Sequence, residues 1–438
     1  MKKAAFCSES NRCYHIKATI LTIFHPSYFR HPSNSVYLTH ITNIRKEEVL
    51  LTLFTSWLTN SLRPYFGLHM LENHWDTHQI REDYFICFEG DVIKKRIFVN
   101  EHSYQEADVD ILTRNREMIV PQTARGKEKK LNYTTISAVK ATGVIFSAGL
   151  GNEHQPSSYI TARNAKTYYR LPLTGFEHLT TKSAIMDWLL QFPTQLPTDY
   201  ADKLKKLTKM KSLRYKAVPG DIFRVEIDLF VNGYVLVIGD LRQMQKDQLF
   251  AEDSIWHNVM TMPLFIRPYL LTTTERLPSL EEITAAPLAS QTQIVMDDYF
   301  MRGCYEKLGH KTLTEDDILF PLGYGQTLHY GKEPRYRLSW GTGTISKPAS
   351  ITTFQTGNRF TNHGVSAGVA TDWLKSEEEN ASRSLAHPYY HKEHQQAFAE
   401  FGLPADITYD EFNRQTGGLT RHEYLHYLHK SENRSHKK

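Results

Sequence analysis

The sequence is poor in cysteine and has no long apolar run. Its four cysteines, Cys7, Cys13, Cys87 and Cys304, show no Cys-x-x-Cys spacing, so we expect reduced thiols in a cytosolic protein. The apolar run at residues 20–24 is far shorter than the ~20 residues of a membrane helix. No signal-peptide pattern stands at the N-terminus, and we therefore expect a cytoplasmic protein.

Several nucleotide and hydrolase signatures are also missing. The sequence has no phosphate loop of the form Gly-x-x-x-x-Gly-Lys-Ser, no Gly-x-Ser-x-Gly elbow and no dinucleotide fingerprint after a predicted strand. The sequence therefore contains no motif that would predict phosphate-loop or serine-hydrolase chemistry. The chain is nevertheless long enough, at 438 residues with 40% hydrophobic content, for two or three folded domains.

The charge is distributed unevenly along the chain. Residues 221–320 contain 16 acidic and 8 basic side chains, a net of −8, although the whole chain carries +4. The remainder is therefore strongly basic, at +12. An acidic block of this kind repels nucleic acid and attracts basic proteins, unless it is simply a solvated surface.

A hairpin pattern opens this acidic block. Pro219-Gly220 is a turn signal, and the following strand alternates apolar residues with charged ones up to Asp228. Asn232-Gly233 favours a tight return, because both residues tolerate positive φ. A nearly continuous apolar strand then runs to Gly239.

The remaining patterns predict an α+β protein in three parts. Residues 1–212 form a mixed N-terminal domain, residues 213–375 a mainly antiparallel β domain shaped as a curved sheet or half-barrel, and residues 376–438 a short, helical, basic tail. Helix starts are predicted at Thr181 and at capping boxes that begin with Ser279, Thr408 and Thr420.

The order of turn, strand, Asn-Gly and Tyr-containing strand resembles the opening of the bacterial immunity protein 26 family, the antidote modules of polymorphic toxin systems. The resemblance extends over residues 213–375 and includes the stretches Gly303-Cys304-Tyr305-Glu306-Lys307-Leu308-Gly309-His310, Phe320-Pro321-Leu322-Gly323-Tyr324-Gly325, Leu338-Ser339-Trp340-Gly341 and Asn362-His363-Gly364-Val365.

The resemblance implies a non-enzymatic protein that neutralises a cognate toxin by stoichiometric binding. It implies no catalytic group and no cofactor. Nuclease toxins are commonly basic, and an acidic face would speed and orient their capture. The candidate toxin-binding residues are acidic or aromatic side chains of the central block: Asp297, Asp298, Tyr299, Tyr305, Glu306, Glu315, Asp316, Asp317 and Trp340.

A zinc peptidase is the first enzymatic alternative. His422-Glu423-Tyr424-Leu425-His426 has the His-Glu-x-x-His pattern that holds zinc on one helix face. Only 12 residues follow His426, and we expect this basic end to fray and to form no dry cleft around a third ligand. Glu423 also completes the capping box of Thr420, which gives it a structural role.

Further alternatives lie in other parts of the chain. Asp108, Asp110 and Glu128-Lys129-Lys130 imitate a metal-dependent nuclease, although the tripeptide sits in a loop-like basic run. The basic N-terminal half could instead bind nucleic acid with a steep salt dependence. Two histidine groups could bind metal loosely: His69, His74 and His78, with the last two on a possible helix, and His387, His391 and His394.

Overall fold

The computed structural model describes residues 56–121, 123, 125–154, 156–259, 261–274, 276–327, 333–361, 364–374 and 384–435. They fall within one compact unit, Thr52–Lys438. Cys7 and Cys13 lie outside the described residues, whereas Cys87 and Cys304 are buried free thiols. Among the described helices, none is both long and apolar enough to cross a membrane.

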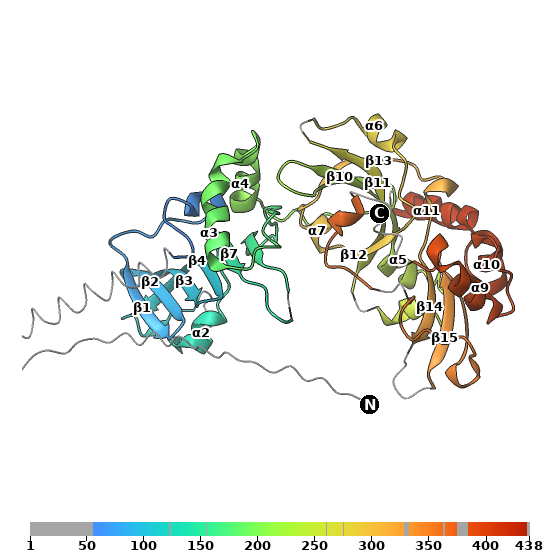
Figure 1. The fold of residues 1–438 in the computed structure, drawn as a ribbon, viewed down its shortest axis with the longest axis horizontal. Helices are drawn as coiled ribbons and strands as arrows, with labels where there is room; N and C mark the ends of the chain where they lie inside the picture. The colour runs from blue at the N-terminus through green and yellow to red at the C-terminus, as the bar shows by residue number, and fades with distance from the viewer. Residues whose placement is uncertain are drawn as a thin grey trace, which may run out of the picture. The chain divides into compact units, whose positions relative to one another are not determined.

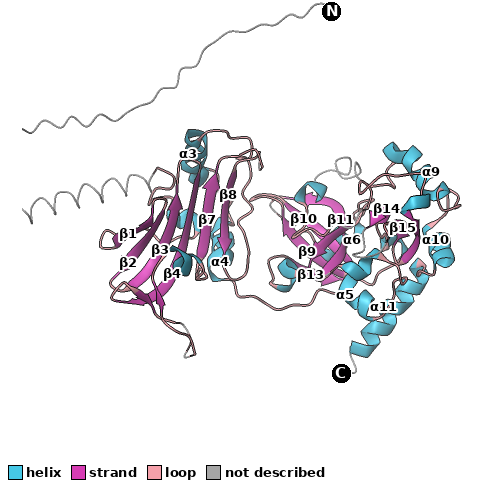
Figure 2. Cartoon of the chain, turned by 90° about the horizontal axis from the view of Figure 1, so that it is seen from below, coloured by secondary structure: helices cyan, strands magenta, loops and turns pink. Residues whose placement is uncertain are grey.

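The first part of the described chain is built on an antiparallel sheet. Its strands β1–β4, β7 and β8 lie side by side (Figure 2). Burial alternates along β3, where Ile93, Ile97 and Val99 face the core, as the strand period requires. The strands are β1 (Asp76–Arg81), β2 (Tyr84–Glu89), β3 (Val92–Val99), β4 (Ser103–Arg114), β5 (Met118–Ile119), β6 (Lys129–Lys130), β7 (Val144–Gly149) and β8 (Tyr159–Asn164).

Short helices accompany this sheet. Thr181 caps α3 as predicted, because its side chain accepts a hydrogen bond from the Ala184 N–H. The helices are η1 (Arg63–Phe66), α2 (Tyr133–Ser137), α3 (Lys182–Gln191), η2 (Phe192–Thr194) and α4 (Tyr200–Lys209). The mixed composition predicted for this region is therefore present in its described part.

A five-stranded antiparallel sheet forms the centre of the predicted β domain (Figure 1). Its order is β12-β11-β10-β9-β13, so β13 is an edge strand. The predicted hairpin is confirmed as the pair β9–β10, in which Glu226 lies opposite Asn232. The strands are β9 (Asp221–Glu226), β10 (Asn232–Asp240), β11 (Pro263–Thr273), β12 (Gln293–Met296) and β13 (Glu306–His310).

The turn of this hairpin is not the one that the sequence suggested. Asn232 and Gly233 already belong to β10. The reversal lies at residues 227–231, where the Asp228 carboxylate accepts hydrogen bonds from the Phe230 and Val231 N–H groups at 2.8 Å. An Asx-type turn therefore replaces the Asn-Gly turn. Gly233 has a packing role instead, since a Cβ there would lie 2.9 Å from Leu374.

Both faces of the central sheet are buried. Phe223, Val225 and Val235 belong to one apolar cluster. Their neighbours Ile222 and Leu236 belong to a second cluster on the other face. The strand period of two thus sends adjacent apolar residues into separate cores, which explains why β10 is apolar almost throughout.

The rest of the chain adds a small sheet and further helices. The large, open antiparallel sheets and the helices together make the fold α+β, as predicted. The small sheet consists of β14 (Leu322–Thr327), β15 (Arg335–Trp340) and β16 (Gly343–Pro348). The helices are α5 (Leu241–Lys246), η3 (Ile255–Asn258), α6 (Leu280–Ala285), α7 (Asp298–Met301), η4 (Glu315–Asp317), η5 (Ala349–Ile351), η6 (Thr371–Leu374), η7 (Pro388–Tyr390), α9 (His391–Ala399), α10 (Tyr409–Thr416) and α11 (Arg421–Ser435).

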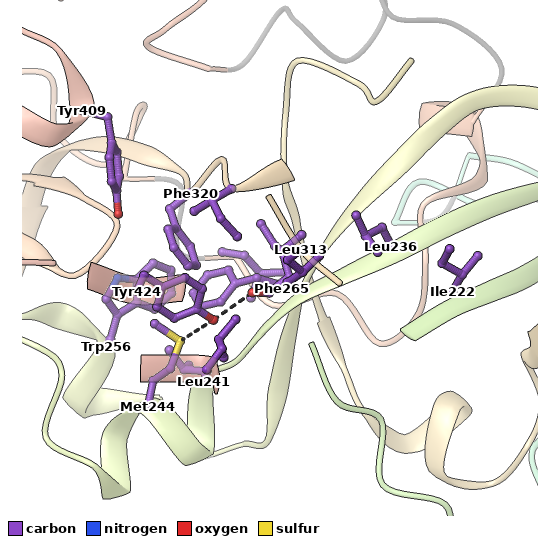
Figure 3. Close-up of a cluster of buried hydrophobic side chains, with 14 of the residues drawn as sticks. Ile222, Leu236, Leu241, Met244, Trp256, Phe265, Leu313, Phe320, Tyr409 and Tyr424 are labelled. Atoms are coloured by element: carbon purple, nitrogen blue, oxygen red, sulfur yellow. Dashed lines mark hydrogen bonds between the residues drawn. The ribbon is translucent and has the colours of Figure 1, made fainter. Parts of the chain in front are cut away.

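The C-terminal helix α11 is anchored in the central core, which the tail-like sequence did not suggest. Tyr424 is fully buried among Trp256, Phe265 and Phe320 (Figure 3). Its hydroxyl donates a 2.8 Å hydrogen bond to the Ile238 carbonyl of β10. The helix is therefore part of the packing of the sheet.

We expect Tyr424→Ala to lower the free energy of unfolding by about 3–5 kcal/mol, because it removes a fully buried aromatic side chain. Tyr424→Phe keeps the ring and should cost about 1 kcal/mol through the lost hydrogen bond. His426→Ala, on the exposed side of α11, should stay within about 0.5 kcal/mol of the parent. Urea denaturation measures all three, and equal small losses would contradict this role of α11.

Candidate functional site

The Pro219-Gly220-Asp221 turn has a tightly defined geometry. Gly220 has a φ of +95°, which residues with a Cβ rarely adopt. A Cβ at this position would lie 2.5 Å from both the His310 ring and the Lys311 carbonyl. Glycine is therefore required twice here, by the backbone conformation and by the close approach of β13.

Asp221, the next residue, is a buried acceptor that joins several segments. Its side chain is 0% exposed. It accepts hydrogen bonds from the Tyr215 hydroxyl and the Val218 N–H, and it contacts Lys307 Nζ at 2.7 Å and His310 Nδ1 at 2.9 Å. The linker before the hairpin and the edge strand β13 are thus tied to one carboxylate.

The Asp221 contacts fix two side chains beside a pocket. Lys307 Nζ also donates to the Tyr215 hydroxyl at 2.7 Å. Burial opposes the charge of Lys307, but its hydrogen bonds to Asp221 and Tyr215 outweigh burial and raise its pKa. Burial and the bond to Asp221 likewise raise the pKa of Tyr215. Lys307 is therefore held as a cation in a defined position.

This pocket, which we call the β13 pocket, has a volume of about 710 Å³. Its apolar lining residues include Leu213, Phe223 and Phe300. Cationic side chains line it as well, namely Lys206, Arg214, Lys216, Arg224 and Lys307. A pocket of this size with convergent polar groups is typical of a binding site.

Five of the predicted binding residues lie near this pocket, at what we call the α7–β13 edge: Asp297, Asp298, Tyr299, Tyr305 and Glu306. The Tyr299 and Tyr305 rings pack edge to face, with centroids 5.6 Å apart. Tyr305 and Glu306 also line the β13 pocket. Asp297 has a raised pKa, because it is partly buried and lies near Asp298 and Asp240.

Some of these five residues have internal partners as well. Glu306 forms a 2.5 Å ion pair with Arg224 and keeps a side chain that is 49% exposed. Asp298 pairs with Arg302 at 3.4 Å. The Tyr305 hydroxyl accepts a hydrogen bond from the Val369 N–H at 3.0 Å. The edge is thus structurally fixed and still offers carboxylates to a partner.

The other predicted residues lie elsewhere. Glu315, Asp316 and Asp317 form η4, which contacts α11. Ile318, the next residue, belongs to the buried cluster that contains Tyr424, whereas Phe300 belongs to the cluster on the other face of the sheet. Asp317 is buried, completes a capping box with Thr314 and pairs with Lys311 at 2.8 Å. The acidic candidates therefore divide between the two faces of the central sheet.

Trp340 belongs to the third sheet. Its ring packs against Phe398, Tyr409 and Phe412, with centroids 5.5–6.3 Å apart. These neighbours come from α9 and α10, so the indole helps to join the helices to β15.

The His-Glu-x-x-His pattern lies on α11, but its glutamate is occupied. The Glu423 carboxylate accepts hydrogen bonds from both the backbone N–H and the hydroxyl of Thr420, which confirms the capping box. The hydrogen bond from the Thr420 N–H is the main cause that lowers the pKa of Glu423. His422 is 84% exposed and lies 3.4 Å from Glu315. Among the described residues, no group of three or more His, Cys, Asp or Glu is arranged to hold a metal ion.

The first histidine group does not lie on a helix, because residues 76–81 form strand β1. His74 contacts Glu89 at 3.1 Å, and the His78 ring packs against Phe88. In the other group, His394 contacts the carbonyls of Leu385 and Ala405. These histidines have local partners of their own.

The nuclease-like residues are not gathered into one site. Asp110 pairs with Lys94 on the surface, and Glu128 pairs with Arg114. Lys129 and Lys130 form the short strand β6, not the loop that was expected. Asp108 is buried and pairs with Lys95.

Asp108 belongs to a buried ionic cluster that the sequence did not reveal. Lys95 contacts both Asp108 and Glu106, and Arg63 contacts Glu106 at 3.0 Å. Burial opposes ionisation of Glu106, yet Lys95 and Arg63 outweigh it and lower its pKa. The Tyr104 hydroxyl adds a 2.6 Å hydrogen bond to Glu106. Two cations balance two carboxylates, and Asp108 also accepts a hydrogen bond from the His69 N–H and lies 3.1 Å from the His69 ring.

Sequence reasoning missed Tyr215, Lys307 and His310 as partners of Asp221. The turn that carries Asp221 was recognised, but β13 lies more than 80 residues further along the chain. The run Lys307-Leu308-Gly309-His310 carries two basic groups beside a small residue, which was the one available signal.

Comparison with known proteins finds a family model that matches part of this region. Residues 218–333 match the family model described as Immunity protein 26, which confirms the resemblance over that stretch. The match contains the Asp221 contacts with Lys307 and His310 and the whole α7–β13 edge. It ends before β15, so Trp340 lies outside it. No curated protein and no solved structure matches the chain.

We expect Gly220→Ala to lower the free energy of unfolding by about 2–4 kcal/mol, from backbone strain and from crowding against His310. Gly402→Ala is the matched control, because Gly402 also has a positive φ, +69°, but a Cβ there would meet no other atom within 4 Å. It should cost about 1 kcal/mol. Thermal and urea denaturation compare the two, and equal losses would contradict the close-packing argument.

Lys95→Met should destabilise the protein by about 3–5 kcal/mol, because it leaves two buried carboxylates with one cation. Lys94→Met, the neighbouring substitution, removes surface pairs and should cost less than about 1 kcal/mol. Urea denaturation of both variants makes the comparison. A Lys95→Met protein of normal stability would show that the cluster has no structural role.

Proposed function

We propose that this protein is an immunity protein that neutralises a cognate bacterial toxin by stoichiometric, non-catalytic binding. The single observation that carries the proposal is the match of residues 218–333 to the Immunity protein 26 family. Binding alone blocks a toxin if the bound surface includes or covers its active site, so no catalytic group is required of the immunity protein.

The α7–β13 edge is the proposed toxin-binding surface. Tyr299 and Tyr305 supply aromatic rings of the kind that dominate interface energetics. Asp297 and Asp298 are adjacent carboxylates, and their mutual repulsion adds to burial in raising the pKa of Asp297. A basic group of a partner would relieve this repulsion, which favours binding of a cationic surface.

The toxin itself is proposed to be basic, such as a nuclease toxin. The net charge of −8 over residues 221–320 supports this proposal. Glu315 and Asp316 would form a second acidic contact on the other face of the sheet. Asp317 and Trp340 would shape the surfaces through their packing rather than touch the toxin.

The test is to express the product of the gene beside this one, with and without the full chain, in the same host. We expect the neighbour to arrest growth and the full chain to restore it. Calorimetry of the purified pair should give a stoichiometry of one to one. A neighbour without toxicity, or growth arrest that persists despite well-expressed chain, would contradict the proposal.

Charge reversal then locates the surface. The double variant Asp297→Lys/Asp298→Lys should weaken toxin binding at least about tenfold, since it replaces attraction by repulsion. The matched comparison is Glu315→Lys/Asp316→Lys on η4, the proposed second contact, which should weaken binding by less, about threefold. The reverse result would move the interface to η4.

A further inference from the structure

The β13 pocket has chemistry that the acidic composition of the region does not suggest. Its lining includes apolar residues, of which Leu213 is 69% exposed. Solubility does not explain an exposed leucine beside the cationic side chains of Arg214 and Lys307. This combination fits a ligand that has an apolar body and negative charge.

Arg214 is the most informative of the cationic lining residues. Its φ of +55° lies in the left-handed region, which arginine rarely adopts. The flanking bonds from Leu213 N–H to Arg302 O at 3.4 Å and from Tyr215 N–H to Met301 O at 2.9 Å hold this conformation. The side chain is exposed, and the described residues offer it no ion-pair partner. Strained residues of this kind concentrate at binding sites.

Lys307 supplies a second, fixed cation. Two of its three N–H groups are accounted for by Asp221 and by the Tyr215 hydroxyl. The remaining N–H has no further acceptor among the described residues, and Lys307 lines the pocket. Because Asp221 is buried and fixed, the ammonium is positioned before any ligand arrives.

We propose that the β13 pocket binds an acidic polypeptide segment in which an aromatic or aliphatic side chain stands beside a carboxylate. The carboxylate would pair with Arg214 and Lys307, and the apolar side chain would contact Leu213 and the half-buried ring of Tyr215. β13 ends the sheet, so its outer backbone groups lack a strand partner in the described chain and are available to an extended peptide.

A peptide explains these features better than a phosphate ligand. Phosphate sites are typically built from backbone N–H groups at helix N-termini or in glycine-rich loops. The cations that line this pocket are lysine and arginine side chains, and Leu213, Phe223 and Phe300 are apolar lining residues. The inference rests on the proposed function, since the segment would belong to the toxin, and it adds an acidic contact beside the basic surface expected at Asp297 and Asp298.

The test uses the full chain and synthetic peptides, so that it does not depend on the toxin. The probe is a blocked, fluorescein-labelled heptapeptide with the core Asp-Phe-Glu, and the control peptide has the core Asn-Phe-Gln. Fluorescence anisotropy should show that the acidic probe binds at least about tenfold more tightly, with an affinity that falls as salt is raised.

Two variants connect this binding to the pocket. Arg214→Gln should weaken the acidic probe about fivefold without loss of stability, because Arg214 is exposed. Lys307→Met should weaken it at least about tenfold, with its stability followed in parallel. The matched control Lys246→Gln, an exposed position on α5, should have no effect.

Three results would overturn the inference. They are equal binding of both peptides, equal effects of Arg214→Gln and Lys246→Gln, and displacement of the probe by inorganic phosphate at micromolar concentration, which would assign the pocket to a phosphate ligand. If the peptide test fails while growth rescue succeeds, toxin neutralisation stands and only the role of the pocket is lost.

Discussion

The central sheet depends on the buried carboxylate of Asp221. One side chain accepts hydrogen bonds from the linker, through Tyr215 and Val218, and contacts Lys307 and His310 of β13. A buried carboxylate is tolerated only when its hydrogen-bonding capacity is filled, and these four groups fill it. The edge strand, the linker and the start of the hairpin are consequently fixed together. This arrangement determines the shape of the β13 pocket.

Structural roles of this kind also account for part of the acidic composition. Several carboxylates of the central block serve the fold: Asp228 forms the hairpin turn, and Glu226 is buried against Lys203, Lys206 and Tyr169. A count of charges along the sequence therefore overstates the acidity of the surface. What remains at the α7–β13 edge are the carboxylates of Asp297, Asp298 and Glu306, next to a pocket lined with cationic side chains, which suits a partner that presents charges of both signs.

The sequence predicted those features that depend on neighbouring residues. Thr181, Ser279, Thr408 and Thr420 all cap helices, because a cap and its N–H partner are three residues apart. The hairpin was predicted for the same reason. The type of its turn was not predicted, because the Asp228 side chain, which lies outside the Asn-Gly pair, accepts the hydrogen bonds of the backbone N–H groups in the turn. The Asp221–Lys307 and Lys95–Glu106 contacts depend on strand pairing, which no local pattern specifies.

The family match and the folding unit have different boundaries, and the C-terminal helix shows why. Residues 218–333 include Phe265 and Phe320, yet the cluster around these rings is completed by Tyr409 and Tyr424 from beyond the match. A fragment cut at the limits of the match would expose that cluster to water, at a cost of the order of 25 cal/mol per Å² of apolar surface. Glu423 caps the helix that brings Tyr424 into the core. This structural role accounts for the glutamate of the peptidase-like pattern.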